Sequence, residues 1–437
     1  MTTTQHKLLP LAILCLLLSV FTACTDSDRD KDGVADDRDK CPTEFAKTKD
    51  GCPVKKELGK IRFYVDNSAS MGAYFKDPEF NEVVSDLSVK VDKKIRPVEI
   101  WYIADEAVKY PGDARQFSTD IATTKYTQQK SSQLHKMIAE IVAAGDSNDV
   151  AFLVSDCILS FPDADIKKNP EINRTSAAST LKNDIFGTFA DLKKKGLATS
   201  VYAFTAKPSG IYYTYQNARI PMNGNYERPF YVWVIADKAL LADFNAQLAD
   251  ISTFKPEKEL HFGLSEEPVK KYEIIPQIER TGSWMKTSDG IEQLKQDDQF
   301  CIAVNLNTLP AYARNKKYLE KHLDIEQKGC KVDFEVKEKE DVNKSKLKSE
   351  PQIKDFEAST HFIIVTLKEM PAKDASITLD LPLEYDTWFK EWSTMDDKNI
   401  AAADEKTFAF EHLINGVREA YDTKNNSYLH FSLSLKK

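Results

Sequence analysis

Apolar runs and amphipathic segments alternate along the chain between about residue 60 and residue 251. The segments between the runs carry apolar residues at helical spacing, as in 132–145, which ends at Gly145. Apolar strands that alternate with helices are typical of a sheet covered on both faces. We therefore expect an α/β fold with a doubly wound, mostly parallel sheet. Its predicted strands are IRFYVD (61–66), VEIWYIA (98–104), DVAFLVSD (149–156), ATSVYAFTA (198–206) and RPFYVWVIAD (228–237).

Beyond residue 255 the pattern changes to strand-like runs, several with period two. In the last run, 428–437, the side chains expected to face inward are Leu429, Phe431, Leu433 and Leu435. This half predicts a β-rich, sandwich-like region, in which the charged stretch 337–350 is expected to be a long exposed loop or linker. An amphipathic segment, 408–421, predicts a helix that packs on this sheet or returns to the α/β domain.

Composition narrows the choice of function. A length of 437 residues suffices for two or three domains. The net charge of −8 argues against nucleic acid as the main partner, because binding of that kind needs a basic face. Seven histidines are scattered along the chain, and no Gly-rich phosphate loop is present. We therefore do not expect an enzyme.

The N-terminus predicts a targeting segment. Lys7 precedes an apolar core, 8–20, which has the length of a signal peptide and is short for a bilayer span. The following FTAC, Phe21 to Cys24, resembles the lipobox of bacterial lipoproteins, although Phe21 stands where that family usually has Leu. The resemblance implies a signal peptide (1–23), lipid on Cys24, attachment to a membrane, and export to the cell envelope, with the outer membrane favoured. The alternative is an ordinary secretory signal.

An acidic segment follows the expected anchor. Its aspartates stand at positions 1, 3, 5, 9 and 12 of a loop with Gly33 at position 6, which is the ligand spacing of an EF-hand-type calcium loop. With the trailing DKCP and DGCP, the segment resembles a thrombospondin type 3 repeat. We expect a Ca²⁺-stiffened stalk (24–57), and the alternative is a solvated acidic linker. The expected ligands are Asp28, Asp30, Asp32, Asp36, Asp39 and the carbonyl of Val34.

Five cysteines remain once the signal and the lipid site are set aside. Cys41 and Cys52 lie close together in a segment with few core residues, so we expect a disulfide between them. A second pair, Cys301 with Cys330, is left open. Cys157 stands in an apolar stretch and is expected to be a free buried thiol.

Two predicted strands end in aspartate, at Asp66 and Asp156. The carboxyl ends of parallel strands meet at one edge of an α/β sheet, so both side chains can face one crevice. With the hydroxyls of Ser68 and Ser70 they form a set of hard oxygen ligands, which suits Mg²⁺, Mn²⁺ or Ca²⁺. The alternative is that Asp66 and Ser68 cap the next helix.

The segments VDNSASM and LVSD resemble a von Willebrand factor A (vWA) domain with its metal-ion-dependent adhesion site. The resemblance implies Mg²⁺ or Mn²⁺ and a protein partner whose carboxylate completes the metal's coordination. Two residues, Ala69 and Cys157, stand where that family commonly has glycine. The implied ligands are Asp66, Ser68, Ser70, Ser132 (with Thr127 as second choice) and Asp156.

These observations predict a lipid-anchored envelope protein in four parts. They are the signal peptide (1–23), the stalk (24–57), a vWA-like binding domain (58–255) and a β-rich accessory region (256–437). One alternative is a metal-dependent hydrolase or phosphoryl-transfer enzyme that uses the strand-end aspartates. Another is a structural envelope lipoprotein with a degenerate metal site.

Overall fold

The computed structural model divides the chain into two units, Met1–Glu57 and Leu58–Lys437. Within the described residues, the helices and strands lie in the second unit. The structure describes residues 33–35, 37–40, 48–50, 56–127, 133–158, 167, 174–264, 268–288, 290–307, 309–370, 372–422 and 427–437.

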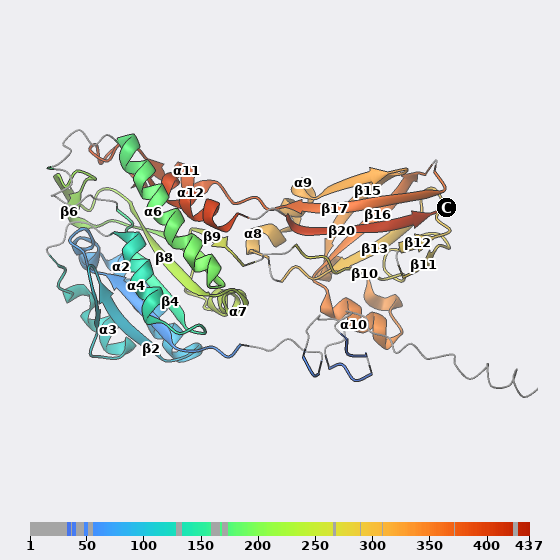
Figure 1. Ribbon diagram of the computed structural model, residues 1–437, viewed down its shortest axis with the longest axis horizontal. Coiled ribbons are helices and arrows are strands. Elements are labelled where there is room, and N and C mark those ends of the chain that lie inside the picture. The colour runs from blue at the N-terminus through green and yellow to red at the C-terminus, as the bar shows by residue number, and fades with distance from the viewer. Residues whose placement is uncertain are drawn as a thin grey trace, which may run out of the picture. The chain divides into compact units, whose positions relative to one another are not determined.

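A seven-stranded sheet forms the centre of the α/β part (Figure 1). Its spatial order is β3-β2-β1-β4-β8-β5-β9. Strands β1, β2, β4 and β5 run in one direction, and β3, β8 and β9 run in the other. The strands are β1 (Ile61–Asp66), β2 (Val98–Ile103), β3 (Ala107–Lys109), β4 (Val150–Ser155), β5 (Leu197–Ala206), β8 (Arg228–Asp237) and β9 (Lys258–Phe262).

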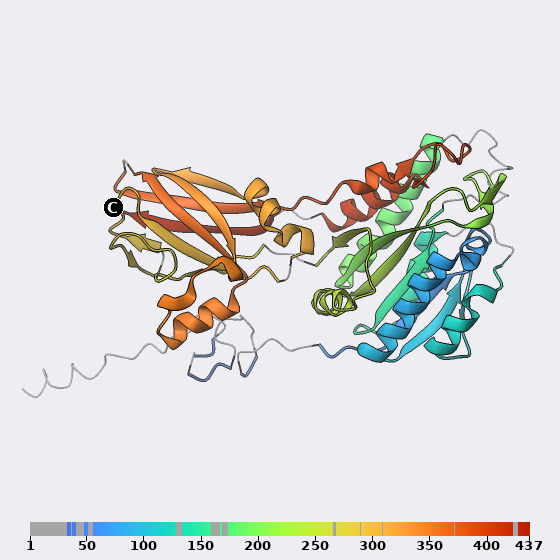
Figure 2. The ribbon, with the colours of Figure 1, turned by 180° about the vertical axis from the view of Figure 1, so that it is seen from behind.

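Helices cover both faces of this sheet, as Figures 1 and 2 show. One apolar core joins the sheet to α2 (Pro78–Lys94), α3 (Ala114–Asp120) and α7 (Lys238–Ala249). A second core joins its other face to α4 (Leu134–Ala144), α6 (Arg174–Lys194) and α12 (Phe410–Tyr421). The expectation of a mixed α/β fold with a large covered sheet is thus confirmed. Strand β9 also belongs to these layers, although its residues fall within the span 256–437 that the sequence assigned to the β-rich region.

Strand β8 differs from the expectation in direction. It lies between β4 and β5 and is antiparallel to both. A short hairpin, β6 (Ser209–Tyr213) with β7 (Arg219–Asn223), connects β5 to β8, so the chain returns without a crossover helix. Every residue of β8 is buried. An apolar run of this kind looks the same in either direction, which is why its pattern could not reveal the antiparallel pairing.

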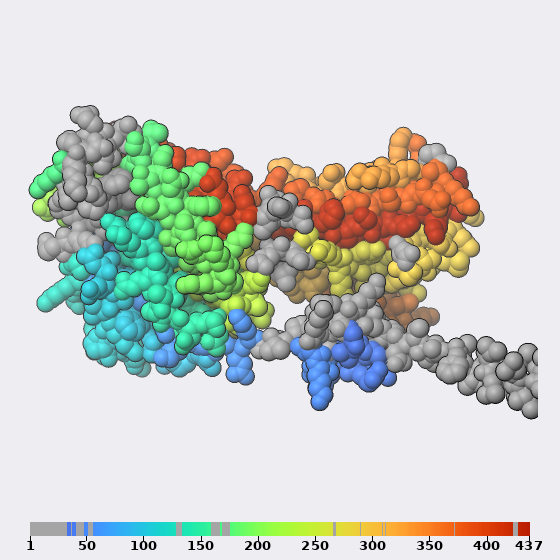
Figure 3. Space-filling model, viewed as in Figure 1, coloured from blue at the N-terminus to red at the C-terminus, as the bar shows by residue number. Residues whose placement is uncertain are grey.

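Helix α12 returns from the far end of the chain to the α/β part and packs beside α6 (Figure 3). The ring of Phe410 stacks on Tyr231 of β8, with the ring centres 4.2 Å apart. At the other end of the helix, the Tyr421 hydroxyl donates to the Leu197 carbonyl over 2.9 Å. The amphipathic pattern therefore identified the helix, and these contacts settle which of the two expected partners it has.

The β-rich part consists of two sheets that enclose a shared apolar core. One sheet has the order β10-β13-β16-β15 and the other β11-β12-β20-β17-β14. Their strands are β10 (Glu273–Ile274), β11 (Met285–Lys286), β12 (Gly290–Glu292), β13 (Gln299–Val304), β14 (Asp324–Lys328), β15 (Lys331–Glu338), β16 (His361–Glu369), β17 (Asp374–Pro382) and β20 (Ser427–Lys436). Within β20 the period-two expectation is confirmed, because Leu429, Phe431, Leu433 and Leu435 are buried.

Short helices complete this half: α8 (Ala311–Arg314), α9 (Lys316–His322) and α10 (Glu350–Ala358), whereas α11 (Trp388–Glu391) packs with α12 in the core of the α/β part. Cys301 and Cys330 are both free, buried thiols, so the second disulfide does not form. They face different cores, because Cys301 packs with Phe356 and Phe362 whereas Cys330 packs between the two sheets. Cys157 is a free buried thiol, as expected.

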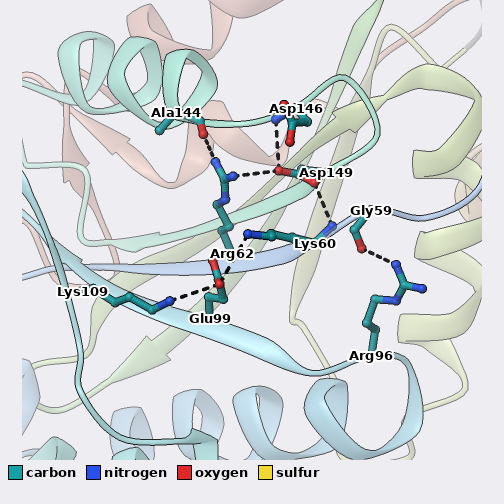
Figure 4. Close-up of polar contacts among 9 residues, drawn as sticks. All are labelled: Gly59, Lys60, Arg62, Arg96, Glu99, Lys109, Ala144, Asp146 and Asp149. Atoms are coloured by element: carbon teal, nitrogen blue, oxygen red, sulfur yellow. Dashed lines mark hydrogen bonds and ion pairs between the residues drawn. The ribbon is translucent and has the colours of Figure 1, made fainter.

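A buried ion pair fixes the amino ends of the central strands (Figure 4). Arg62 of β1 pairs with Asp149 over 3.1 Å and donates to the Ala144 carbonyl at the end of α4. The same carboxylate accepts the backbone N–H groups of Lys60 and Asp146 at 2.8 and 3.0 Å. Because the charge is paired and hydrogen-bonded, its burial is tolerated, and α4 is tied to β1 and β4.

The close approach of α12 to α6 leads to a prediction. A Cβ added at Gly416 would lie 2.6 Å from the Lys182 backbone carbonyl, whereas one added at Gly187, also in a helix, would meet nothing within 4 Å. Gly416→Ala should lower the free energy of unfolding by about 1–3 kcal/mol. The matched control Gly187→Ala should raise it by about 0.5–1 kcal/mol. Urea unfolding of both variants tests this, and equal effects would contradict the packing.

Candidate functional site

The loop after β1 gathers three of the predicted ligands. Asp66 ends the strand, and its Oδ1 accepts the Ser68 backbone N–H over 2.9 Å. The hydroxyl oxygens of Ser68 and Ser70 lie 3.1 Å apart. Ser70 opens a short 3-10 helix, η1 (Ser70–Gly72). All three side chains are buried, with exposed fractions of 0 to 3%.

Strand β4 brings Asp156 to the same edge of the sheet. It pairs with β1 in parallel, so the carboxyl ends of the two strands are neighbours. The hydroxyl of Ser155, the last residue of β4, donates to Asp66 Oδ2 over 2.8 Å. The strand-end aspartates are therefore brought together, as the two sequence segments predicted.

Asp156 is the most unusual group at this site. Its Oδ1 accepts the Ile158 backbone N–H at 3.1 Å, but among the described residues its fully buried Oδ2 accepts no hydrogen bond of standard geometry. Burial, and next the negative charge of Asp66, raise the pKa of Asp156 to about 7, although the nearby Ser70 hydroxyl lowers it somewhat. Two buried carboxylates with one unsatisfied oxygen form a site that a cation would stabilise.

One buried cation already lies nearby. Arg228 begins β8, which runs antiparallel to β4, so the start of β8 meets the end of β4. Its guanidinium stacks on the Tyr212 ring at 4.7 Å and donates to the Ala403 carbonyl. The positive charge of Arg228 lowers the pKa of Asp156, but burial and Asp66 outweigh it. With both carboxylates ionised, these three groups still carry a net charge of −1.

Two of the described segments cover this edge of the sheet. One is the β6–β7 hairpin. The other, residues 395–406, is called the strap here and connects β18 (Ser393–Thr394) to β19 (Thr407–Phe408), which pair in parallel. Ile400 of the strap packs in one apolar cluster with Ala73, Ile158, Tyr212 and Met222. Ala73 follows Ser70 and Ile158 follows Asp156, so the strap lies against both ligand loops.

Hydrogen bonds hold the strap in this position. Asp397 accepts the Tyr215 backbone N–H at 2.7 Å, and Asp404 accepts that of Glu227 at 2.7 Å. Beyond the strap, the Phe408 ring stacks on Tyr215 at 4.6 Å. In this arrangement the candidate ligands are shielded from solvent.

Cys157 follows Asp156 with φ of 53°, in the left-handed region that favours glycine. Its N–H donates to the Ser155 hydroxyl over 3.0 Å, and its Sγ accepts the Trp233 indole N–H at 3.3 Å. The sequence difference from the vWA pattern at this position therefore places a side chain in a glycine-like conformation. The thiol packs in the apolar core that joins the sheet to α4, α6 and α12.

The remaining predicted ligand is Ser132, with Thr127 as second choice. Ser132 lies outside the described residues. The side chain of Thr127 is exposed, and its backbone N–H donates to the Asn67 carbonyl over 2.8 Å, which brings the chain at Thr127 beside the loop after β1. The helix-cap alternative is not supported for Asp66 and Ser68, because Asp77 caps α2 by accepting the Phe80 N–H at 2.9 Å.

The residues present fit a small divalent cation. Oxygens at adjacent corners of an octahedron around Mg²⁺ lie roughly 3 Å apart, because Mg–O distances are about 2.1 Å. The Ser68 and Ser70 hydroxyls are hydrogen-bonded to each other at 3.1 Å, a separation that two ligands at such an edge would also have. Within the described ranges, no group of three or more His, Cys, Asp or Glu side chains is placed to hold a metal. Any metal here would therefore rely on hydroxyl and carboxylate oxygens together.

Little of the calcium loop is described. Gly33 has φ of 101°, a conformation that glycine adopts readily, as the sharp turn of such a loop requires. Asp39 is largely buried, and its N–H donates to the Ala35 carbonyl at 2.8 Å. Of the other predicted ligands only Val34 is described. The positions outside the described residues are Asp28, Asp30, Asp32 and Asp36, together with Cys24, Cys41 and Cys52.

Comparison with protein-family models gives no match, and no curated protein or solved structure is significantly similar to the chain. None of the helices in the described ranges is both long and apolar enough to cross a membrane.

Sequence reasoning missed three parts of this site. Ser155 could have been found, because it directly precedes the strand-end aspartate and is polar within an apolar run. Arg228 gives a weaker signal, because it is a single charged residue at the start of an otherwise largely apolar run. The strap left no signal, because it comes from a segment more than 200 residues away in the sequence.

The raised pKa of Asp156 predicts how stability depends on pH without metal. Between about pH 4 and pH 7 the folded chain binds a proton at Asp156 that the unfolded chain has released, so stability falls as the pH rises through this window. Asp156→Asn should remove this fall and be more stable than wild type at pH 8, by roughly 2–4 kcal/mol. The difference should vanish near pH 4. Urea unfolding in EDTA measures it, and parallel curves for the two proteins would contradict the assignment.

Proposed function

We propose that the α/β part is a vWA-like binding domain that uses a divalent cation, Mg²⁺ or Mn²⁺, to bind a protein partner. Asp66, Ser68, Ser70 and Asp156 are the ligands. One observation carries the proposal: two adjacent strands end in buried carboxylates, and Asp156 Oδ2 lacks a hydrogen-bond partner among the described residues.

The charges of the site support binding through the cation. The two carboxylates and Arg228 sum to −1, so a divalent ion would leave a local charge of +1. Such an ion attracts one further anionic oxygen, and a carboxylate of a partner protein supplies it. The two serine hydroxyls are neutral ligands and do not cancel this charge.

The strap sets a condition on this function. A partner carboxylate can reach the cation only when Ile400 and its neighbours move away from the two ligand loops. The folded strap therefore represents the closed form of the site, and binding of a partner requires displacement of residues 395–406. We propose that the metal enters by the same route.

The N-terminal segment supports a place for this domain in the cell. The apolar core 8–20 and the cysteine at position 24 support export and lipid anchoring to the bacterial envelope, with the outer membrane favoured. The spacing of Asp28, Asp30 and Asp32 supports a Ca²⁺-stiffened stalk between the anchor and the binding domain. On this proposal the protein is not an enzyme.

Calorimetric titration with Mn²⁺ tests the metal site. The full chain in detergent should bind Mn²⁺, and Asp156→Asn should weaken this binding at least tenfold, because a charged ligand is lost. The control Asp243→Asn removes the same charge from an exposed position on α7 and should leave binding unchanged. The stalk can bind cations too, so the chain with Asp28→Asn and Asp32→Asn serves as the parent for both variants. Equal affinity of Asp156→Asn and its parent would refute the site.

Limited proteolysis tests the stalk. Removing Ca²⁺ with EGTA should speed cleavage within residues 25–57, because carboxylates crowded into one loop repel each other without a cation. Asp32→Asn should be cleaved fast with or without Ca²⁺. If EGTA leaves the cleavage rate of the wild-type chain unchanged, the segment is a linker and not a calcium loop.

A further inference from the structure

A cavity of about 210 Å³ lies away from the strand-end aspartates, on the α7 and β9 side of the sheet. Asn245 of α7 and the β9 residues Glu259 and His261 line it on one side. On the side of the β-rich part its lining residues are Asn307, Leu309, Pro310 and Arg314. Pockets for drug-sized molecules measure about 300–1,000 Å³, so this cavity suits a smaller ligand.

Its walls combine apolar side chains with two opposite charges. The rings of Tyr202 and Phe254 meet edge to face, with centres 4.9 Å apart, and Leu309 adds an aliphatic surface. Glu259 and Arg314 are both half-buried at the lining. Among the described residues no ion pair joins the two, and the buried Nε of Arg314 has no hydrogen-bond partner. A half-buried guanidinium with an unused donor favours an anionic ligand.

The Glu259 carboxylate is kept ionised. Burial alone would raise its pKa, but the contact with His261 and the charges of His261 and Arg314 outweigh burial, so its pKa is lowered. His261 Nε2 lies 3.5 Å from Glu259 Oε2. On the other side of the ring, the Ser200 hydroxyl and the Asn245 amide lie 2.8 and 3.3 Å from Nδ1. These contacts on both sides hold the imidazole ring between Ser200 and the Glu259 carboxylate.

The row Ser200, His261 and Glu259 has the residue types of a nucleophilic triad, but it cannot act as one. Ser200 is fully buried and does not line the cavity, so no substrate can reach its hydroxyl. The contacts from Ser200 through His261 instead hold the Glu259 carboxylate in position. Arg314 is likewise held, because its backbone carbonyl lies 2.7 Å from His361 Nε2.

We propose that this cavity binds a free α-amino acid with an apolar side chain. The ligand's carboxylate pairs with Arg314, its ammonium group pairs with Glu259, and its side chain lies against Tyr202, Phe254 and Leu309. The two charged residues, held apart from one another, match the two charges of an α-amino acid. This site is separate from the cation site and does not depend on the proposed function.

Saturation-transfer NMR and calorimetry on the full chain, with chelator present, test the proposal. L-Phenylalanine should bind, whereas phenethylamine, which lacks the carboxylate, and 3-phenylpropionate, which lacks the ammonium group, should each bind at least tenfold more weakly. Glycine should also bind more weakly, because it has no side chain. These ligand comparisons use the wild-type chain and need no variant to fold.

Variants assign the binding to this cavity. Arg314→Gln and Glu259→Gln should each weaken phenylalanine binding at least tenfold. The matched control Lys317→Gln alters an exposed charge on α9 and should change nothing. Absence of phenylalanine binding at about 10 mM, equal binding of all three phenyl compounds, or unaltered binding by Arg314→Gln would each overturn the proposal.

Discussion

The need to cover both faces of the central sheet shapes the whole 58–437 unit. Strand β8 is buried along its entire length, so it requires an apolar layer on each side. Helices α4 and α6 leave part of one face uncovered, and α12 fills it from the far end of the chain. The chain therefore leaves the β sandwich after β17, crosses to the α/β part and returns as β20. The two halves are joined by this passage as well as by the direct connection after β9.

The same passage determines the state of the candidate site. To reach α12 the chain runs past the carboxyl edge of the sheet, and the strap lies on the loops that carry Ser70 and Asp156. The carboxylates are buried as a result, and burial beside Asp66 raises the pKa of Asp156. The strap thus buries the carboxylates of Asp66 and Asp156 close together, and their repulsion destabilises the folded chain. A bound cation would remove this repulsion. Stability and metal binding are coupled through this one carboxylate.

Much of this could be predicted from local pattern. The apolar runs identified β1, β2, β4, β5 and β8, and helical spacing identified α12 with Phe410 and Val417 on its buried face. The juxtaposition of Asp66 and Asp156 followed from two parallel strands ending in acids. The position and direction of β8 did not follow, because a strand buried on both faces has no pattern that reports direction. Neither the strap nor Arg228 could be placed, since their contacts to the site depend on tertiary structure.

The central claim is that the two strand-end carboxylates form a cation site. Anomalous diffraction from crystals of the full chain grown with Mn²⁺ tests it most directly. The account predicts a manganese peak within coordination distance of Asp156 and the Ser68 and Ser70 hydroxyls, and no such peak in Asp156→Asn. A well-ordered structure with Mn²⁺ bound elsewhere on the chain, and none between Asp66 and Asp156, would contradict it.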